Sequence, residues 1–242
     1  MVMGAKAAGA MGTDTADFVR LEGVTKRYAQ RGDQVYALRA VNLQVARGSF
    51  LTVTGLSGSG KTTLLLTIGG LIRPTDGRVL VEGDDVYRLG PAGIAAYRNR
   101  KVGFVLQSFH LIPYLNALEN VMVPMVLRGC ANGAGELRAR ALLDRLGLSD
   151  RREHLPRELS VGQQQRVAIA RALANDPGLI LADEPTGNLD PTLSREILGV
   201  LRELNQREGR TIIMVTHSPE AARVGSHRLH LEDGRVVPET AA

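Results

Sequence analysis

Six short apolar segments alternate along the chain with polar and glycine-rich stretches. They are rich in Val, Ile, Leu and Thr, are bounded by Gly, Pro or charged residues, and occupy positions 18–24, 50–55, 77–83, 101–106, 178–184 and 211–217. Segments of this length and composition predict β-strands. Helical patterns follow three of them, at 61–69, 192–207 and 219–223. Buried strands that alternate with helices are typical of an α/β fold with a mainly parallel sheet.

Two regions depart from this alternation. The segment "QVYALRAVNLQVARG" at 34–48 links the first two strands and favours hairpins, so we expect an antiparallel β subdomain on the N-terminal side. From about residue 108 to residue 175 the chain has no clear strand, whereas 116–129, 134–148 and 161–176 have helical spacing and charged faces. We therefore predict an α-helical subdomain that is inserted into the α/β core.

The composition fits one folded domain with a subdomain. The chain has 242 residues, of which 44% are hydrophobic, and no run of about 18 apolar residues that could span a membrane. Residues 1–17 are mostly small and lack the apolar segment of a signal peptide, so we expect a flexible lead-in before a domain at 18–237. These features together predict a cytoplasmic protein.

Charge and cysteine content narrow the classes of partner. The net charge of +5 and the isoelectric point of about 9.7 are compatible with a nucleotide, a nucleic acid or lipid headgroups. The arginines are spread along the chain instead of forming one cluster, so we expect no nucleic-acid partner. The single cysteine, Cys130, excludes an intrachain disulfide.

The segment "GLSGSGKT" at 55–62 fits the phosphate-binding pattern G-x-x-x-x-G-K-[ST], and it joins an apolar strand to a helical segment as the motif requires. Glycines let successive N–H groups point into one concavity, and the helix start adds free donors. We expect Lys61 to reach the β- and γ-phosphates of a nucleoside triphosphate, Thr62 to bind Mg²⁺ and Thr63 to contact the α-phosphate side. The residues expected to bind nucleotide here are Gly55, Leu56, Ser57, Gly58, Ser59, Gly60, Lys61, Thr62 and Thr63.

Two carboxylates stand at the end of the apolar segment "LILADEP" at 179–185. A buried acid is costly unless it has a partner, and a Mg²⁺ ion held opposite Lys61 would supply one. We expect Asp183 to bind this metal, directly or through water. Glu184 would then polarise the attacking water as the general base of phosphoryl transfer.

Five further segments stand in a characteristic order around these two motifs. They are "VTKRY" with Tyr28, "FVLQSFHLIP" with Gln107, "ELSVGQQQRVAIARAL" at 158–173, "GNLD" with Asp190 and "MVTH" with His217. Together with the glycine loop they make residues 18–237 resemble the ATP-binding-cassette (ABC) ATPases, with "ELSVGQQQRVAIARAL" as the signature motif of that family. The resemblance implies a P-loop NTPase fold and hydrolysis of ATP with Mg²⁺.

The resemblance also implies a role for each of these side chains. Tyr28 would stack on the adenine ring. Gln107 carries an acceptor for Mg²⁺ or its water and a donor for a phosphate oxygen, where the core meets the helical subdomain. His217 would hydrogen-bond the γ-phosphate from a strand end. Asp190 is expected to cap the following helix and to lie at a subunit interface.

A second copy of the chain is the first partner that the resemblance implies. In this family two ATP-binding domains pack head to tail, and the signature of one closes over ATP held by the glycine loop of the other. The signature residues expected to supply donors across the interface are Ser160, Gly162 through its N–H, and Gln163 at the helix start.

The second implied partner is an integral membrane permease. The segments 36–50, 69–79, 110–129 and 181–190 resemble one branch of the family. That branch includes ATPases of lipoprotein-release and macrolide-export systems and a cell-division ATPase with an FtsX-like membrane partner. The permease would be another chain that holds this protein on the inner face of the bacterial plasma membrane. The segment "LIPYLNALENVMVPMVL" at 111–127 either lines the groove for its coupling helix or packs internally.

Two functions stay open at this point. The protein powers export or release of a lipoprotein, lipid or drug, or it regulates cell-wall hydrolysis through a membrane partner without transport. A third, action on DNA or ribosomes, is disfavoured because ABC proteins of that class carry two cassettes or a long coiled-coil insertion, and this chain has neither.

The signature motif departs from the family pattern L-S-G-G-Q, since Val161 replaces its first glycine. A β-branched residue tolerates positive φ poorly, so Val161 should have an ordinary backbone conformation and a side chain directed away from the phosphates. We therefore expect the closed site to form and Val161→Gly to change the ATPase turnover of the assembled complex. Steady-state turnover measures this, and an unchanged rate would refute the expectation.

Overall fold

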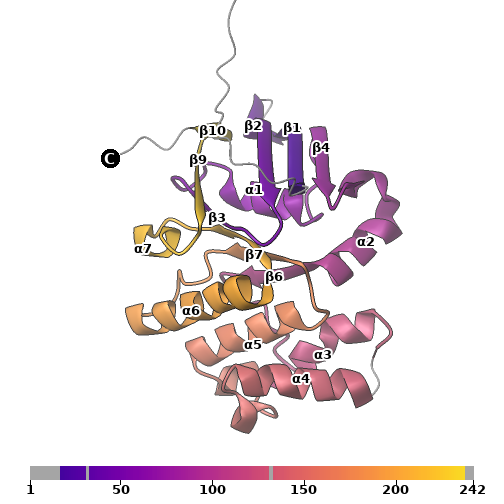
Figure 1. Ribbon diagram of the computed structural model, residues 1–242, viewed down its shortest axis with the longest axis vertical. Helices are drawn as coiled ribbons and strands as arrows, with labels where there is room; N and C mark the ends of the chain where they lie inside the picture. The colour runs from indigo at the N-terminus through magenta and orange to yellow at the C-terminus, as the bar shows by residue number, and fades with distance from the viewer. Residues whose placement is uncertain (1–16, 31–32, 131–132, 238–242) are drawn as a thin grey trace, which may run out of the picture.

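The computed structural model describes residues 17–30, 33–130 and 133–237. The expected lead-in lies outside these residues except for Asp17, which begins the first strand. From the top of Figure 1 downward, the described chain forms an antiparallel sheet, a parallel sheet and a group of helices. Within these residues no helix is long and apolar enough to cross a membrane.

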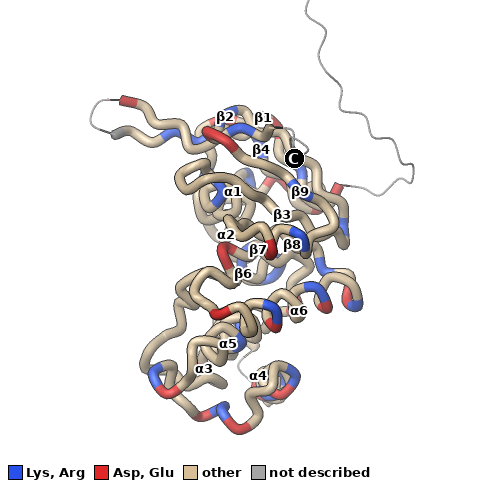
Figure 2. Tube along the Cα trace, turned by 90° about the vertical axis from the view of Figure 1, so that its left-hand side faces the viewer, with Lys and Arg blue, Asp and Glu red and all other residues tan. Residues whose placement is uncertain are grey.

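The antiparallel sheet has the strand order β2-β1-β4-β5. Its strands are β1 (Asp17–Gln30), β2 (Asp33–Ala46), β4 (Asp76–Val81) and β5 (Asp84–Asp85). This sheet confirms the antiparallel subdomain that the sequence predicts. The far end of the β1–β2 hairpin extends beyond the rest of the sheet (Figure 2), and Tyr28 and Val35 near it are 41% and 45% exposed.

The second sheet has the order β10-β9-β3-β8-β7-β6, and all its pairs are parallel except β9 with β10. Its strands are β3 (Phe50–Thr54), β6 (Val102–Leu106), β7 (Leu179–Asp183), β8 (Thr211–Val215), β9 (His227–Glu232) and β10 (Arg235–Val237). Since its parallel strands end at one edge, the segments that follow β3, β6, β7 and β8 meet there. This is the predicted α/β core.

Helices cover both faces of the parallel sheet (Figure 1). They are α1 (Lys61–Ile68), α2 (Gly90–Lys101), α3 (Ala117–Leu127), α4 (Gly133–Arg145), α5 (Val161–Leu173), α6 (Pro191–Glu208) and α7 (Pro219–Ala222), with 3-10 turns at Val86–Arg88, Ser149–Arg151 and Pro156–Glu158. The helices α3, α4 and α5 pack together below the sheet and correspond to the predicted helical insertion.

The apolar runs of the central strands build two cores. In β7, Leu179 and Leu181 pack with α1 and the antiparallel sheet, whereas Ile180 and Ala182 pack with α3 and α5. Successive side chains of a strand point to opposite faces, so a strand that is buried on both faces needs a continuous apolar run. The run "LILA" therefore places this strand at the centre of the molecule.

Three elements have no clear sequence signal. The helix α2 buries only Tyr97, so it lacks the apolar stripe that predicts a helix. The strand β9 alternates His and Arg with Leu and was not among the predicted strands, and the strand β10 is only three residues long. The strand β9 pairs with β3, which is distant in sequence, and β10 pairs with β9.

A buried amide ties the segment 112–116 to α3. Asn120 is fully buried, and its Oδ1 accepts a hydrogen bond from Ile112 N at 2.8 Å. Its Nδ2 donates to the carbonyl oxygens of Ile112, Leu115 and Asn116 at 3.2, 2.8 and 3.0 Å. The Asn120 side chain thus provides hydrogen-bond partners for backbone groups of a segment that is neither helix nor strand.

We predict that Asn120→Leu lowers the free energy of unfolding by about 2–3 kcal/mol, because it leaves several buried polar groups without partners. Urea unfolding followed by circular dichroism measures the change. Gln206→Leu is the matched control, because the Gln206 side chain is exposed on α6 and makes no hydrogen bond with any described residue. Equal stability of the two variants would contradict the role of Asn120.

Candidate functional site

The glycine loop joins β3 to α1 and has a shape that requires glycine. Gly58 and Gly60 have φ of 82° and 103°, in the left-handed region that side chains disfavour. A Cβ on Gly60 would lie 2.1 Å from the carbonyl oxygen of Ala37 in β2. The loop therefore packs against the antiparallel sheet, and its path depends on the absence of a side chain at this position.

The first turn of α1 keeps its backbone donors free of side-chain caps. Gly60 occupies the N-cap position and supplies no capping group. The first N–H groups of a helix lack partners within the helix and favour an anion. Lys61 lies beside them, and its Nζ donates to the carbonyl oxygens of Gly55 and Leu56 at 2.7 and 2.8 Å. A cation and free amides thus converge on the mouth of the loop, as a phosphate site requires.

A hydroxyl and a carboxylate meet where α1 approaches the end of β7. Thr62 Oγ1 donates to Asp183 Oδ1 at 3.2 Å. Burial raises the pKa of Asp183, and the nearby negative charge of Glu184 adds to this, while the Thr62 hydrogen bond opposes it. A carboxylate whose charge is disfavoured gains from a nearby cation. The described residues contain no group of three His, Cys, Asp or Glu side chains that could hold a metal by themselves.

These ligands fit Mg²⁺ better than a metal ion whose ligands all come from the protein. Mg²⁺ is bound by one or two carboxylates together with waters and substrate phosphates. Asp183 and Thr62 provide one carboxylate and one hydroxyl beside the phosphate loop. Gln107, the third predicted ligand, lies on the same cavity and could add an amide oxygen.

Glu184 and His217 form a pair across the ends of β7 and β8. Glu184 Oε1 lies 2.8 Å from His217 Nδ1, which fits an imidazole that donates from Nδ1. The Glu184 side chain is 13% exposed and that of His217 is 67% exposed. Glu184 has a positive φ of 46°, and its N–H donates to the carbonyl oxygen of Val215. This constrained backbone places the carboxylate next to the histidine.

One cavity of about 450 Å³ collects most of the predicted site, and we call it the glycine-loop cavity. Its lining consists of Ala37, Ser57, Gly58, Gly60, Lys61, Thr62, Thr63, Gln107, Glu184 and His217. Of the other loop residues, Ser59 is buried, Leu56 is 80% exposed and Gly55 approaches the carbonyl oxygen of Leu231. They shape the loop and do not line the cavity. Ala37, which had no sequence signal, forms one wall.

Tyr28, the predicted adenine-stacking residue, does not line the cavity. It lies on the projecting part of β1 with Lys26 Nζ 5.0 Å from its ring centre. Its exposure shows that it is not a buried core residue. The ring is accessible to a ligand, and its stacking on adenine stays a prediction.

The signature residues also lie outside the cavity. Ser160 caps α5, where its Oγ accepts from Gln163 N at 3.3 Å and its N–H donates to Gln163 Oε1 at 3.0 Å. Val161 is the first residue of the helix, has no positive φ and is 45% exposed, which agrees with the backbone expectation. Gly162 is buried, and a Cβ there would lie 2.9 Å from Leu193 of α6. These polar groups therefore do not contribute to the glycine-loop cavity of their own chain.

Asp190 caps α6 as predicted. Its Oδ1 accepts hydrogen bonds from the backbone N–H groups of Thr192 and Leu193 at 2.8 and 3.0 Å. Leu193 is also the residue that contacts Gly162, so this cap lies beside the start of the signature helix. That contact was not predicted from the sequence.

The turn that follows Gln107 is held by the signature helix. Phe109 and His110 have positive φ values of 55° and 46°, which are costly for residues with side chains. Arg171 on α5 donates to both of their carbonyl oxygens at 2.6 Å. Burial lowers the pKa of this guanidinium. The arginine thereby links α5 to the segment that carries Gln107.

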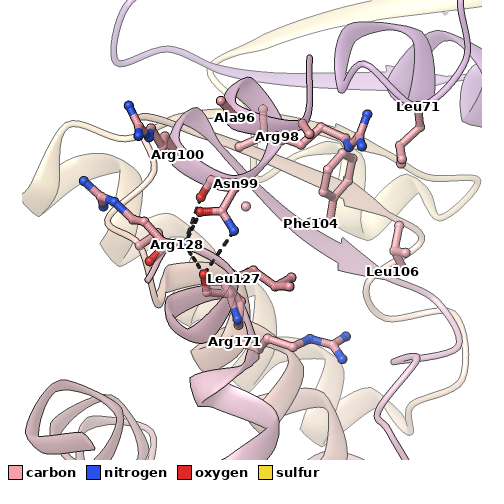
Figure 3. A pocket seen from close by; sticks show the side chains of 16 residues that line it. Leu71, Ala96, Arg98, Asn99, Arg100, Phe104, Leu106, Leu127, Arg128 and Arg171 are labelled. Carbon is pink, nitrogen blue, oxygen red and sulfur yellow. Dashed lines mark hydrogen bonds between the residues drawn. The ribbon is translucent and has the colours of Figure 1, made fainter. Parts of the chain in front are cut away.

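A larger cavity of about 660 Å³ lies between α2 and β6 on one side and α3 and α5 on the other, and we call it the α2–α3 groove (Figure 3). The sequence left open whether the segment 111–127 lines a groove or packs internally. Of this segment, only Pro124 and Leu127 line the α2–α3 groove. Leu118, Val121 and Met125 are buried inside the helical group instead. The other wall belongs to α2, which the sequence did not predict.

Comparisons with known proteins agree with this geometry. A protein-family model described as "ABC transporter" matches residues 38–187. The chain is 46% identical to the lipoprotein-releasing system ATP-binding protein LolD of Geobacter metallireducens, over 89% of this chain and 96% of that protein. It is 47% identical to the macrolide export ATP-binding/permease protein MacB of Syntrophobacter fumaroxidans, over 93% of this chain but only 32% of that protein. The chain therefore spans about a third of the length of this relative.

A solved structure has the same fold. It is the dimeric, post-hydrolysis state of the ATP-binding cassette MJ0796 of Methanocaldococcus jannaschii, bound to ADP and Pi. The TM-score is 0.85 at 43% identity, and the match covers 91% of this chain and 97% of that one. The two sheets and the helical group thus have the fold of a known ATP-binding cassette.

We predict that Gly60→Ala lowers the affinity for a non-hydrolysable ATP analogue by about tenfold or more, because its Cβ displaces the loop from Ala37. Gly83→Ala is the control: Gly83 has a similar φ of 83°, but its Cβ would meet open space in the β4–β5 turn. Isothermal titration calorimetry measures both affinities. An equal effect of the two substitutions would show that backbone strain alone, and not the loop contact, is responsible.

Proposed function

Because the chain belongs to the ABC transporter family, as an ATP-binding cassette, we propose that it hydrolyses ATP in a head-to-tail dimer and thereby drives a membrane permease. The observation that carries the proposal is the content of the glycine-loop cavity. It brings together phosphate donors, the Thr62 hydroxyl and a glutamate–histidine pair, with Asp183 behind Thr62, and it leaves the signature residues outside. The site thus holds groups for the phosphates and for an attacking water, and it lacks the donors of the signature motif.

The loop and the first turn of α1 bind the triphosphate. Their N–H groups and the Lys61 ammonium would contact the β- and γ-phosphate oxygens. To do so, Lys61 would give up its hydrogen bonds to the carbonyl oxygens of Gly55 and Leu56. Thr62 and Asp183 would hold Mg²⁺ with Gln107 as a further ligand, and the bound ion neutralises phosphate charge. Thr63 lies on the same wall of the cavity.

Glu184 is the proposed base. A water oxygen attacks the γ-phosphorus, its proton passes to the Glu184 carboxylate, and the bond between the γ-phosphorus and the bridging oxygen breaks to leave ADP and phosphate. His217 orients this carboxylate through Nδ1, and in its protonated form Nε2–H would also donate to a γ-phosphate oxygen. This adds a positioning role to the phosphate contact that the sequence suggests for His217.

The second copy supplies the missing donors. The start of α5 presents the Ser160 hydroxyl and the Gly162 N–H in its first turn, while the Gln163 N–H is capped by Ser160 Oγ, and none of these residues lines the cavity of its own chain. A two-fold symmetric, head-to-tail pairing would place it over the phosphates of the other chain. The similar cassette MJ0796 is dimeric in its post-hydrolysis state, which supports this arrangement.

Two observations support a permease as the partner: the names of similar proteins and the position of the α2–α3 groove. The relatives include a protein named for macrolide export and one named for lipoprotein release. The α2–α3 groove lies beside the segment of Gln107, where a cytoplasmic helix of a permease could act on the site. The protein would then lie on the inner face of the plasma membrane and power export or release of a lipoprotein, lipid or drug.

We predict that Glu184→Gln binds ATP, lowers turnover by about a hundredfold or more and accumulates as a dimer, because it keeps the shape of the side chain and removes the base. Light scattering after size exclusion in ATP would then give twice the 26.1 kDa of one chain. Lys61→Ala, in contrast, should weaken ATP binding itself and remain monomeric. A Glu184→Gln monomer with wild-type turnover would show that Glu184 is not the base.

A further inference from the structure

Gln165 is a polar side chain of the signature helix that is fully buried. It lies on α5, the helix that Ser160 caps. Its Nε2 donates to the carbonyl oxygen of Pro185 at 2.7 Å, and this hydrogen bond is itself buried. Pro185 directly follows Glu184, the proposed base. A hydrogen bond thus joins the signature helix to the segment that carries the base.

The chemistry of the two partners fixes the orientation of the Gln165 amide. A proline has no N–H, so the Pro185 carbonyl oxygen needs a donor, and the amide nitrogen must face it. The other end of the side chain, Oε1, is buried and has no hydrogen-bond partner among the described residues. A buried polar atom without a partner is costly, so packing alone would favour an apolar residue here.

The backbone of Glu184 needs support from its surroundings. Its φ of 46° lies in the left-handed region, which a residue with a side chain occupies at a cost. The residue before a proline is restricted further, because the proline ring favours an extended conformation there. Strained conformations persist only where the surrounding structure holds them. The position of the Glu184 carboxylate therefore depends on the groups that fix the backbone on either side of it.

Three hydrogen bonds hold this backbone. The Glu184 N–H donates to the carbonyl oxygen of Val215 at 3.0 Å, and the Glu184 carbonyl oxygen accepts from the Gly187 N–H at 3.0 Å. These two bonds come from the end of β8 and from the turn itself. The third, from Gln165 to Pro185, comes from the helical group. The turn is therefore held by the parallel sheet on one side and by α5 on the other.

We propose that Gln165 is a positioning residue for ATP hydrolysis: its hydrogen bond to Pro185 keeps the Glu184 carboxylate where it can accept the proton of the attacking water. This role rests on the proposed function, in which Glu184 is the base. Displacement of a reacting group by about 1 Å can lower a rate by about a hundredfold. Gln165 does not line the glycine-loop cavity, so loss of its hydrogen bond changes kcat and leaves ATP binding intact.

The substitution Gln165→Met tests this role, because methionine is similarly long and unbranched and lacks the donor. We expect kcat for ATP to fall at least about tenfold while KM changes less than about twofold. Steady-state kinetics measures both, at a temperature where circular dichroism shows the variant to be folded. If Gln165→Met does not fold, Gln165→Asn replaces it, since the shorter side chain withdraws its amide from Pro185, and the same split between kcat and KM is expected.

The matched control is Asn205→Leu on α6. Asn205 Nδ2 also donates to backbone carbonyl oxygens, those of Gly48 and Arg210, at 2.7 and 2.8 Å, but it does not line the glycine-loop cavity or contact the Glu184 turn. The variant loses buried hydrogen bonds of the same kind and should unfold at a lower temperature. Its kcat should nevertheless equal that of the wild-type chain.

A double-mutant cycle with Glu184→Gln separates positioning from general damage to the fold. If Gln165 acts through the Glu184 carboxylate, Gln165→Met lowers turnover at least about tenfold in the wild-type chain but less than about twofold in the Glu184→Gln chain. Release of radioactive phosphate from labelled ATP measures these low rates. A purely structural defect would lower turnover by the same factor in both chains.

Two results would overturn the proposal. One is a wild-type kcat in a folded Gln165 variant, and the other is an equal loss of turnover from Gln165→Met in both chains of the cycle. Failure of the proposed function is a separate outcome: Glu184→Gln alone would then keep wild-type turnover, whatever the Gln165 variants do.

Discussion

The uncapped N-terminus of α1 is the constraint on which the rest of the structure depends. The helices α3, α5, α6 and α7 begin with Asn116, Ser160, Asp190 and Ser218, whose side chains accept from the first backbone N–H groups. The helix α1 begins with Gly60 and, like α2, has no such cap, but only α1 carries Lys61 and the glycine loop at this end. Free amides at a helix start favour an anion, so this end of α1 is built for a ligand that its own chain does not supply.

The parallel sheet brings the reacting groups to that ligand. The glycine loop, Gln107, Asp183 and His217 each follow or end a strand of this sheet, and parallel strands end at the same edge. A general property of α/β folds therefore assembles a site from segments that are far apart in sequence. The first residues of the signature helix do not line the glycine-loop cavity, which is why we propose that a second chain completes the site.

Much of this arrangement could be predicted from the sequence, because it depends on local patterns. Apolar runs followed by Gly, Asp or His marked the strand ends, and six strands and the main helices lie where those patterns indicated. The helix α2 and the wall residue Ala37 could not be predicted, since neither carries an apolar stripe or a reactive group. Likewise, the contact between Gln165 and Pro185 arises only when α5 packs against the segment that follows β7.

The central claim is that the signature of one chain closes over the glycine loop of another. Disulfide cross-linking tests it most directly, with Ser57→Cys in one chain and Val161→Cys in a second chain, both exposed positions, in a Cys130→Ala and Glu184→Gln background. The account predicts a cross-linked pair of the two different chains that forms rapidly with ATP and slowly without it. No cross-link between these positions, or a rate independent of ATP, would contradict it.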